Sequence, residues 1–541
     1  MSQEPLCFFT VDRGTASTAA GLVGRLGGRF RLLGAAAQPA GLPDEPLFER
    51  LVDAVVETDP EALPEHTTWP DWARLEAASF VPGRLVVAAT TERRLGQIEA
   101  AVAGAGWEIG PRITPGRMDP LAATDACLQP GLAGIVVGAS DPPSVDERDP
   151  LPDLCALLGA AAARRGDLLC LLVGGAGEHA DRFPADSIVL GPAAEPVPAT
   201  QPTALRSLAE ELAAQRAPRT RGGVPLPDVR RGFRTSVASL AALLERRVEA
   251  VDIGHSAGQR VLASPEGVQA DLVMADAALV PASALEDEKL VDAVLRWSPL
   301  RADEFEQRDR VRNLRLAPWR DASGDGAQLR MAAARAALAR LEAAWILPDE
   351  PDGRPANRSA DLLVAAGGAF AVAPPPVVAL ALVDTLRRPG GVALFYDHAR
   401  MLGPLGTLEE EADRRRLLAD LLDDALVPLG SAILATGLRP GRNAGTLRLT
   451  SDGQVNEVDL VPGAVQLVDL PPGIAATAEI ETREGAWLGV KARRIALDVA
   501  GGLGGLLVDT RDVPLRLPDR PERRRELLEA WQRPLWTGGE P

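Results

Sequence analysis

The chain has 541 residues, of which 46% are hydrophobic and 25% are charged, so it can bury large cores and fold as roughly three to four domains. Its net charge of -17 argues against a nucleic-acid partner, because an acidic surface repels phosphate backbones. We also expect no membrane span, since no apolar run reaches ~18 residues. Four widely spaced cysteines and no recognisable signal peptide predict a reduced, cytoplasmic protein.

Short apolar runs alternate with helical patterns over the first 225 residues. The strand-like runs are residues 6–11, 29–35, 84–90, 133–139, 168–175 and 187–191. Helical stretches such as residues 151–166 lie between several of them. This alternation predicts an α/β layer with parallel strands. Because the runs are apolar throughout, we expect a sheet that is covered on both faces.

The next 200 residues continue the α/β pattern. Residues 234–254 predict a helix followed by a strand, and residues 327–345 predict another helix with an apolar face. The charged segment between them, residues 298–326, is expected to be a mobile surface excursion. Residues 361–397 predict a strand, a glycine turn, a helix and a second strand. After residue 430, hairpin-like runs with Gly and Pro turns predict a β-rich module.

One stretch near the N-terminus has the residue types of a phosphate-binding loop. In VDRGTASTAA (residues 11–20), an apolar run ends in Asp12 and is followed by Gly14. Three hydroxyls come next, those of Thr15, Ser17 and Thr18. Glycine lets backbone approach a phosphate closely, and N–H groups and hydroxyls donate to its oxygens. The aspartate is suited to hold Mg²⁺, usually through water.

Two later segments complete a set of three. In VDIGHSAGQR (residues 251–260), Asp252 and Gly254 repeat the start of the first pattern. In VAAGGAF (residues 364–370), Gly367 and Gly368 lie between a strand and a helix, where flat backbone can pack on an adenine. Each segment taken alone is also compatible with an ordinary structural turn. The occurrence of all three segments in this order favours a nucleotide site over three unrelated turns.

The three segments in this order resemble the acetate-kinase/sugar-kinase/heat-shock/actin superfamily. More closely, nearly the whole chain resembles the glutamate mutase accessory protein L (MutL) family. The first loop of that family has the pattern D-x-G-S-T-x-T-K. The residues that match or nearly match it are Asp12, Gly14, Thr15, Ser17 and Thr18, and Ala19 replaces the lysine. Asp397 matches an aspartate that recurs in this family, and we expect it to cap a helix.

The resemblance implies an α/β fold with two actin-like (ribonuclease-H-like) lobes around a cleft and a β-rich C-terminal domain. The implied domains are residues 1–225, 226–428 and 429–541. It also implies ATP or ADP as ligand, with Mg²⁺ at Asp12 and Asp252. The implied phosphate- and base-binding residues are Asp12, Gly14, Thr15, Ser17, Thr18, Asp252, Gly254, Gly367 and Gly368.

The second loop departs from the family pattern D-I-G-G-A-T-T-D after its third residue. His255 adds a side chain where backbone must pass close to phosphate, and it is either a phosphate contact or the result of drift at an abandoned site. Ala257 and Gly258 remove two hydroxyls, and Gln259 removes an acid. Losing donors that stabilise a transferring phosphoryl group costs orders of magnitude in rate. We therefore expect hydrolysis to be weak or lost.

Two functions follow from the resemblance. One is an accessory or scaffold protein for an adenosylcobalamin-dependent mutase, which binds nucleotide or formerly did so. The alternative is an active ATP-dependent chaperone that reactivates a cobalamin enzyme. Both imply a protein partner. Intact hydroxyls in the first loop favour nucleotide binding, and the altered second loop favours a scaffold without turnover.

Overall fold

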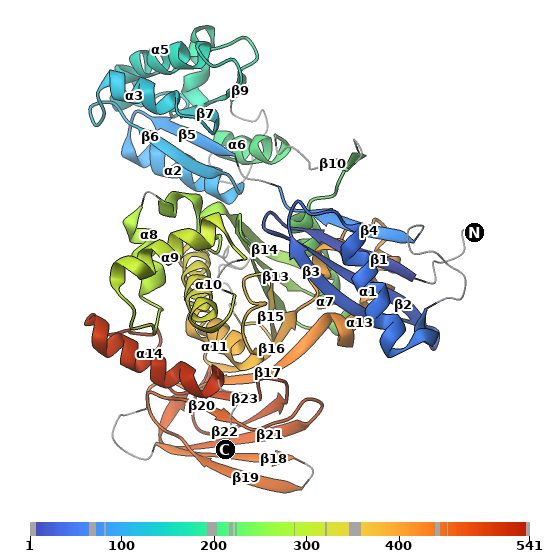
Figure 1. The fold of residues 1–541 in the computed structure, drawn as a ribbon. Helices are drawn as coiled ribbons and strands as arrows, with labels where there is room; N and C mark the ends of the chain where they lie inside the picture. The colour runs from blue at the N-terminus through green and yellow to red at the C-terminus, as the bar shows by residue number, and fades with distance from the viewer. Residues whose placement is uncertain are drawn as a thin grey trace. The chain divides into compact units, whose positions relative to one another are not determined.

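The computed structural model describes most of the chain. The described residues are 7–63, 72–80, 83–191, 203–215, 220–221, 224–285, 287–319, 322–345, 359–438, 444–451 and 453–536. The chain divides into two compact units (Figure 1). The main unit comprises Met1–Ser79, Pro218–Leu272 and Ala277–Pro541, and the inserted unit comprises Phe80–Ala217 and Val273–Asp276.

The main unit begins with a four-stranded sheet in the order β3-β2-β1-β4. Its elements are β1 (Cys7–Arg13), β2 (Ser17–Leu26), β3 (Arg29–Pro39), α1 (Glu45–Thr58) and β4 (Ala73–Ala78). The first three strands form an antiparallel meander, and β4 runs parallel to β1. Phe9 on β1 stacks on Phe48 of α1 with the ring centroids 4.3 Å apart, so this helix covers one face.

A second sheet of eight strands follows, in the order β14-β13-β12-β15-β16-β17-β23-β20. Its strands are β12 (Val248–Ile253), β13 (Gly258–Ser264), β14 (Gly267–Met274), β15 (Leu362–Ala366), β16 (Gly390–Asp397), β17 (Leu426–Leu434), β20 (Val465–Val468) and β23 (Leu506–Asp509). As in the first sheet, the leading strand β12 pairs antiparallel with the next strand and parallel with β15. The order β14-β13-β12-β15 therefore repeats β3-β2-β1-β4.

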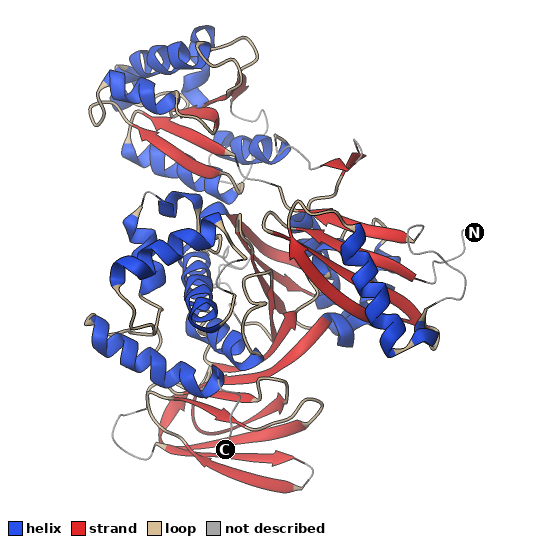
Figure 2. Ribbon diagram, in the orientation of Figure 1, coloured by secondary structure: helices blue, strands red, loops and turns tan. Residues whose placement is uncertain are grey.

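Helices surround these two sheets (Figure 2). They are α7 (Val229–Leu244), α8 (Glu288–Leu295), α9 (Glu304–Leu316), α10 (Gly324–Ala344), α11 (Pro375–Thr385), α12 (Leu402–Leu405), α13 (Glu411–Ala425) and α14 (Pro521–Trp536). One core joins the sheets: Phe8 of the first sheet and Val364 of the second pack with Phe233 of α7 and Leu418 of α13. This shared core holds the ends of β1 and β12 in one place.

Helix α9 lies in the segment for which a surface excursion was expected. Asp303 accepts hydrogen bonds from the N–H groups of the first turn, and Arg308 pairs with Glu288, Asp292 and Glu304. Exposed ion pairs of this kind support a helix that has little apolar surface. The prediction was wrong because it weighed the charge of the segment and not its spacing.

The C-terminal part is rich in β-strands, as predicted. A four-stranded antiparallel sheet has the order β19-β18-β21-β22, with β18 (Gly445–Ser451), β19 (Gln454–Asp459), β21 (Ala475–Trp487) and β22 (Lys491–Ala500). Its Leu447 and Ile480 share a core with Ile433 and Val508 of the eight-stranded sheet. The predicted fold class, a lobed α/β protein with a β-rich C-terminal part, is confirmed. The boundaries at residues 225 and 428 stay predictions.

The inserted unit has its own five-stranded sheet, in the order β6-β5-β7-β8-β9, and every pairing is parallel. Its elements are β5 (Arg84–Ala89), α2 (Glu92–Gly104), β6 (Glu108–Ile113), α3 (Pro120–Cys127), β7 (Leu132–Gly138), α4 (Val145–Arg148), α5 (Pro150–Ala163), β8 (Leu169–Val173), β9 (Ile188–Leu190) and α6 (Thr203–Ala214). Neighbouring residues of β7 enter two different cores, Val136 with Ile98 of α2 and Val137 with Leu158 of α5. The sheet is therefore covered on both faces, as its apolar strands predicted.

Across the described ranges, we find no helix with the length and apolar character needed to cross a bilayer.

Candidate functional site

Two loops occupy equivalent places in the two sheets of the main unit. Loop 1 (residues 12–18) joins β1 to β2, and loop 2 (residues 252–259) joins β12 to β13. Asp12 lies opposite Ala19 on one side and Ala77 of β4 on the other. Asp252 lies opposite Gln259 and Ala366 of β15 in the same way. Each aspartate therefore ends a central strand beside the carboxyl end of a parallel neighbour.

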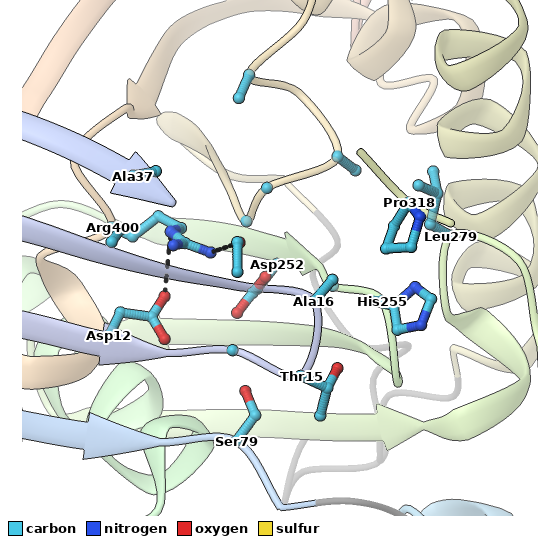
Figure 3. Close-up of a pocket in the computed structure, with 18 of the residues that line it drawn as sticks. Asp12, Thr15, Ala16, Ala37, Ser79, Asp252, His255, Leu279, Pro318 and Arg400 are labelled. Atoms are coloured by element: carbon cyan, nitrogen blue, oxygen red, sulfur yellow. Dashed lines mark hydrogen bonds and ion pairs between the residues drawn. The ribbon is translucent and has the colours of Figure 1, made fainter. Parts of the chain in front are cut away.

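Both loops line one cavity of about 290 Å³ (Figure 3). The predicted residues that line it are Asp12, Gly14, Thr15, Ser17, Asp252, Gly254, Gly367 and Gly368. Thr18 is not among the lining residues; it is buried in β2, where it lies opposite Arg13. Successive side chains of a strand point to opposite faces, so Thr18 points away from the side to which Ser17 points. The part that these residues play in binding stays a prediction.

Close backbone contacts explain the glycines of the site. A Cβ on Gly367 would lie 2.2 Å from Asp252 Oδ1, and this residue has φ +94°, a conformation that favours glycine. A Cβ on Gly14 would lie 2.7 Å from the carbonyl oxygen of Ser17. By contrast, a Cβ on Gly368 would meet only side-chain atoms, Arg400 Nη1 at 3.6 Å and Ser17 Oγ at 3.7 Å. Gly367 is therefore required by the fold, whereas a Cβ at Gly368 would make only ordinary van der Waals contacts.

Arg400 is one of the cavity residues that the sequence analysis did not predict. Its Nε lies 3.4 Å from Asp12 Oδ2, and its Nη1 donates to Ser17 Oγ at 2.8 Å (Figure 3). The residue has φ +54°, a left-handed conformation that is uncommon outside glycine. Asp397 holds this turn, because its two oxygens accept hydrogen bonds from the N–H groups of Met401 and Leu402. The capping role predicted for Asp397 is confirmed.

The charges around the cavity are mainly those of arginine and aspartate. Among the described lining residues, three arginines (Arg230, Arg330 and Arg400) face two aspartates (Asp12 and Asp252). The lining thus has a surplus of positive charge in a chain whose net charge is -17. Such a lining favours an anionic ligand.

Two buried carboxyl groups at this site hold their protons more tightly than usual. Burial, with repulsion from Asp12, raises the pKa of Asp252 to about 6. Burial also raises the pKa of Asp397 to about 7, against the opposing effect of the two N–H groups that it caps. The charged form of Asp252 is thus already unfavourable, and an anionic group placed next to it would raise its pKa further.

Loop 2 differs from loop 1 in its polar groups. Burial, together with the nearby Arg315 and Arg330, lowers the pKa of His255 to about 4, so the imidazole is neutral at pH 7. Its Nδ1 is buried and has no hydrogen-bond partner within the described part of the chain. Ser256 Oγ accepts from Arg230 Nη2 at 3.4 Å. Where loop 2 departs from the family pattern, it thus presents two groups to the cavity: the neutral imidazole of His255 and the Ser256 hydroxyl, which is bound to Arg230.

The segment after α9 covers loop 1. Trp319 Nε1 donates to the carbonyl oxygen of Ala16 at 2.7 Å, and Pro318 and Trp319 both line the cavity. This contact joins residues far apart in sequence, and no local pattern in the sequence announces it.

The predicted Mg²⁺ site at Asp12 and Asp252 does not fit this arrangement. Mg²⁺ takes about six oxygen ligands in near-octahedral geometry and is usually held by one or two carboxylates. Asp12 already faces the guanidinium of Arg400, a cation that would compete with the metal for the same oxygens.

Comparisons with known proteins give similarity only at the level of solved structures. No protein-family model and no curated protein matches the chain. A nucleotide-free acetone carboxylase, from work on ATP-dependent acetone carboxylation, is 12% identical, with 84% of this chain and 80% of that chain covered and a TM-score of 0.27. Component A of (R)-2-hydroxyglutaryl-CoA dehydratase from Acidaminococcus fermentans is 8% identical, with 76% and 99% covered and a TM-score of 0.25. A Ppx/GppA family member from Aquifex aeolicus is 9% identical, with 79% and 93% covered and a TM-score of 0.20. Similarity at this level defines neither a family nor an activity.

Proposed function

We propose that the cavity binds ATP or ADP and that the protein is an accessory or scaffold protein in which nucleotide hydrolysis is weak or lost. The observation that carries this proposal is the convergence of loop 1, loop 2 and the Gly367–Gly368 turn on one cavity with surplus positive charge. A concave site with few, convergent polar groups is the usual form of a small-molecule site.

In this proposal, different residues of the cavity bind the phosphates and the base. The N–H groups of Gly14 and Thr15 and the hydroxyl of Thr15 lie at loop 1, where we place the phosphates. The backbone of Gly368, which lines the cavity, approaches the base. In loop 2, Ala257 and Gly258 stand where hydroxyls would stabilise a transferring phosphoryl group, which supports binding without efficient turnover.

The partner in this proposal is an adenosylcobalamin-dependent mutase. Its support is the sequence resemblance of loop 1, loop 2 and the glycine turn to the accessory protein L family. The active ATP-dependent chaperone remains the second candidate, and the intact Thr15 and Ser17 hydroxyls of loop 1 favour it. Turnover in the presence of the partner distinguishes the two.

A cavity-filling variant tests the proposal without changing any charge. Gly368→Leu places a side chain in the cavity, and its Cβ has ordinary clearance. Gly166→Leu is the matched control, since that exposed glycine of the inserted unit has nothing within 4 Å of an added Cβ. We expect calorimetric titration with ATP and ADP to give micromolar binding to the wild type and to Gly166→Leu, and none to Gly368→Leu. A wild-type chain that gives no heat and no thermal shift at millimolar nucleotide contradicts the proposal.

A further inference from the structure

We propose that this site binds the phosphate groups of its nucleotide without a divalent cation, because Arg400 supplies the positive charge that a metal would supply. This inference rests on the proposed nucleotide function and adds the chemistry by which phosphate is recognised. It follows from the position of Arg400, from the other arginines of the cavity and from the ion pair that Asp12 forms with Arg400.

Arg400 lies between loop 1 and the Gly367–Gly368 turn. Its guanidinium lies against Asp12 and Ser17 of loop 1, and positions for a Cβ on Gly14 and on Gly368 are 3.5 and 3.6 Å from its Nη1. The guanidinium therefore lies at contact distance from both glycine positions. The left-handed backbone of Arg400, held in place by Asp397, directs the side chain here at a conformational cost. Such strain indicates a function for the side chain beyond packing.

Arginines from three separate elements meet at the cavity. Arg230 belongs to the first turn of α7, Arg330 to α10 and Arg400 to the turn before α12, and the first two are nearly fully buried. Guanidinium groups bind phosphate oxygens with two parallel hydrogen bonds and keep their charge at every accessible pH. The serine hydroxyls of the two loops each accept from one of these arginines. We infer that the loop serines position Arg400 and Arg230, and that these guanidinium groups bind the phosphate.

Asp12 acts as an internal counter-ion in this arrangement. It pairs with Arg400 when the cavity holds no anion, and a phosphate group takes its place at the guanidinium. The two roles for Asp12 then make opposite predictions. A carboxylate that holds Mg²⁺ supports nucleotide binding, whereas a carboxylate that competes with phosphate for Arg400 weakens it.

Titration of the full-length chain with ADP, in EDTA and separately in MgCl₂, tests the inference. For the wild type we expect dissociation constants that agree within about threefold in the two buffers. Asp12→Asn should bind ADP in EDTA about three- to tenfold more tightly, because one competing charge is gone. Arg400→Gln should weaken binding by about tenfold or more, and Arg400→Lys, which keeps the charge and loses the planar fork, should lie between. Arg301→Gln, at an exposed arginine paired with Glu529, is the control.

The outcomes separate this inference from the proposed function. If ADP binds only with MgCl₂ and Asp12→Asn abolishes that binding, the arginine inference is overturned and the nucleotide function stands. If ADP binds in neither buffer, the proposed function itself fails. Circular dichroism and thermal unfolding check each variant first. If Arg400→Gln does not fold, Asp12→Asn in EDTA decides the question, since tighter binding supports the inference and loss of binding overturns it.

Discussion

Loop 1 and loop 2 have the same place in their sheets but carry different chemistry. Asp12 of loop 1 ends its strand against an arginine, Arg400, at 3.4 Å. Asp252 of loop 2 ends its strand against backbone, since Gly367 approaches so closely that no Cβ would fit between them. The repeated strand order therefore determines the positions of loop 1 and loop 2. The chemistry around each aspartate depends on residues from other parts of the chain, Arg400 at Asp12 and Gly367 at Asp252.

The difference extends to the residues that follow the parallel neighbour strands. Ala366 lies beside Asp252 and is followed by Gly367, whereas Ala77 lies beside Asp12 and is followed by Ala78. The position after β4's Ala77, beside loop 1, holds the side chain of Ala78. The equivalent position beside loop 2, Gly367, has no room for a Cβ. The predictions below test this asymmetry, from the largest expected effect to the smallest.

The largest effect is expected for Gly367→Ala. The added Cβ would lie 2.2 Å from Asp252 Oδ1 and 2.5 Å from the carbonyl oxygen of Ile253, in a left-handed conformation. We expect unfolding free energy to fall by about 3 kcal/mol, from strain and overpacking together. The matched change beside loop 1 is Ala78→Gly, for which we expect about 1 kcal/mol. Denaturant unfolding of both variants measures the difference, and equal losses would remove the asymmetry.

Asp252→Asn should change how stability depends on pH. The folded-state pKa of Asp252 is raised to about 6, above its value in an unfolded chain, so the folded state binds more protons between about pH 4 and 6. Stability that this group contributes is complete below pH 4 and is lost as pH rises to 6. Between pH 4 and pH 7, the stability of the variant should therefore rise relative to that of the wild type by up to about 3 kcal/mol.

Unfolding of Asp252→Asn and wild type at several pH values makes this measurement, with the exposed Asp53→Asn as control. A difference between Asp252→Asn and wild type that does not vary with pH would show that Asp252 has an ordinary pKa in the folded chain.

His255→Gln should give the opposite pH dependence from the same loop. The folded-state pKa of His255 is lowered to about 4, so the unfolded chain binds more protons between about pH 4 and 6.5. The wild type therefore loses stability as pH falls through this range, and the variant does not. We expect the variant to gain about 2 kcal/mol relative to wild type at pH 4.5 compared with pH 7. The contrary result, a relative gain at high pH, would mean that the imidazole is protonated in the folded protein.

The two serines should show a smaller contrast. Ser17→Ala leaves Arg400 Nη1 without its acceptor at 2.8 Å, and we expect a loss of about 1 kcal/mol. Ser256→Ala removes a longer contact to Arg230, at 3.4 Å, and we expect about 0.5 kcal/mol or less. Thermal unfolding of both variants at one pH compares them. A larger loss for Ser256→Ala would contradict the expectation that the shorter hydrogen bond, that of Ser17, contributes more to stability.

The sequence predicted the loops well because their signal is local. Asp12, Gly14 and Ser17 lie within six residues, and a strand followed by such a turn has few other conformations. Thr18, predicted to bind phosphate, does not line the cavity, because the loop passes into β2 before that residue and strand alternation then turns its side chain away. Helix α9 was missed because its stability comes from Arg308 and acidic partners on the preceding helix.

Arg400 had only an indirect signal in the sequence. Loop 1 has Ala19 where the resembled family has lysine, and its own cation, Arg13, pairs with Asp44 and Glu76. Position 400 follows the capping aspartate Asp397 by three residues, but many arginines lie near an aspartate. Only packing of the two sheets on one shared core brings this one to Asp12.

Local residue order by itself therefore determined the α/β class, the β-rich C-terminal part, the two aspartate loops and the glycine turn. These features depend on hydrophobic period and turn chemistry, which act over a few neighbouring residues. Tertiary structure decided the division into a main and an inserted unit, the charge of the cavity and the partner of each aspartate. Those features depend on contacts across hundreds of residues, such as Arg400 with Asp12, and their energies arise only when burial excludes water from the pair.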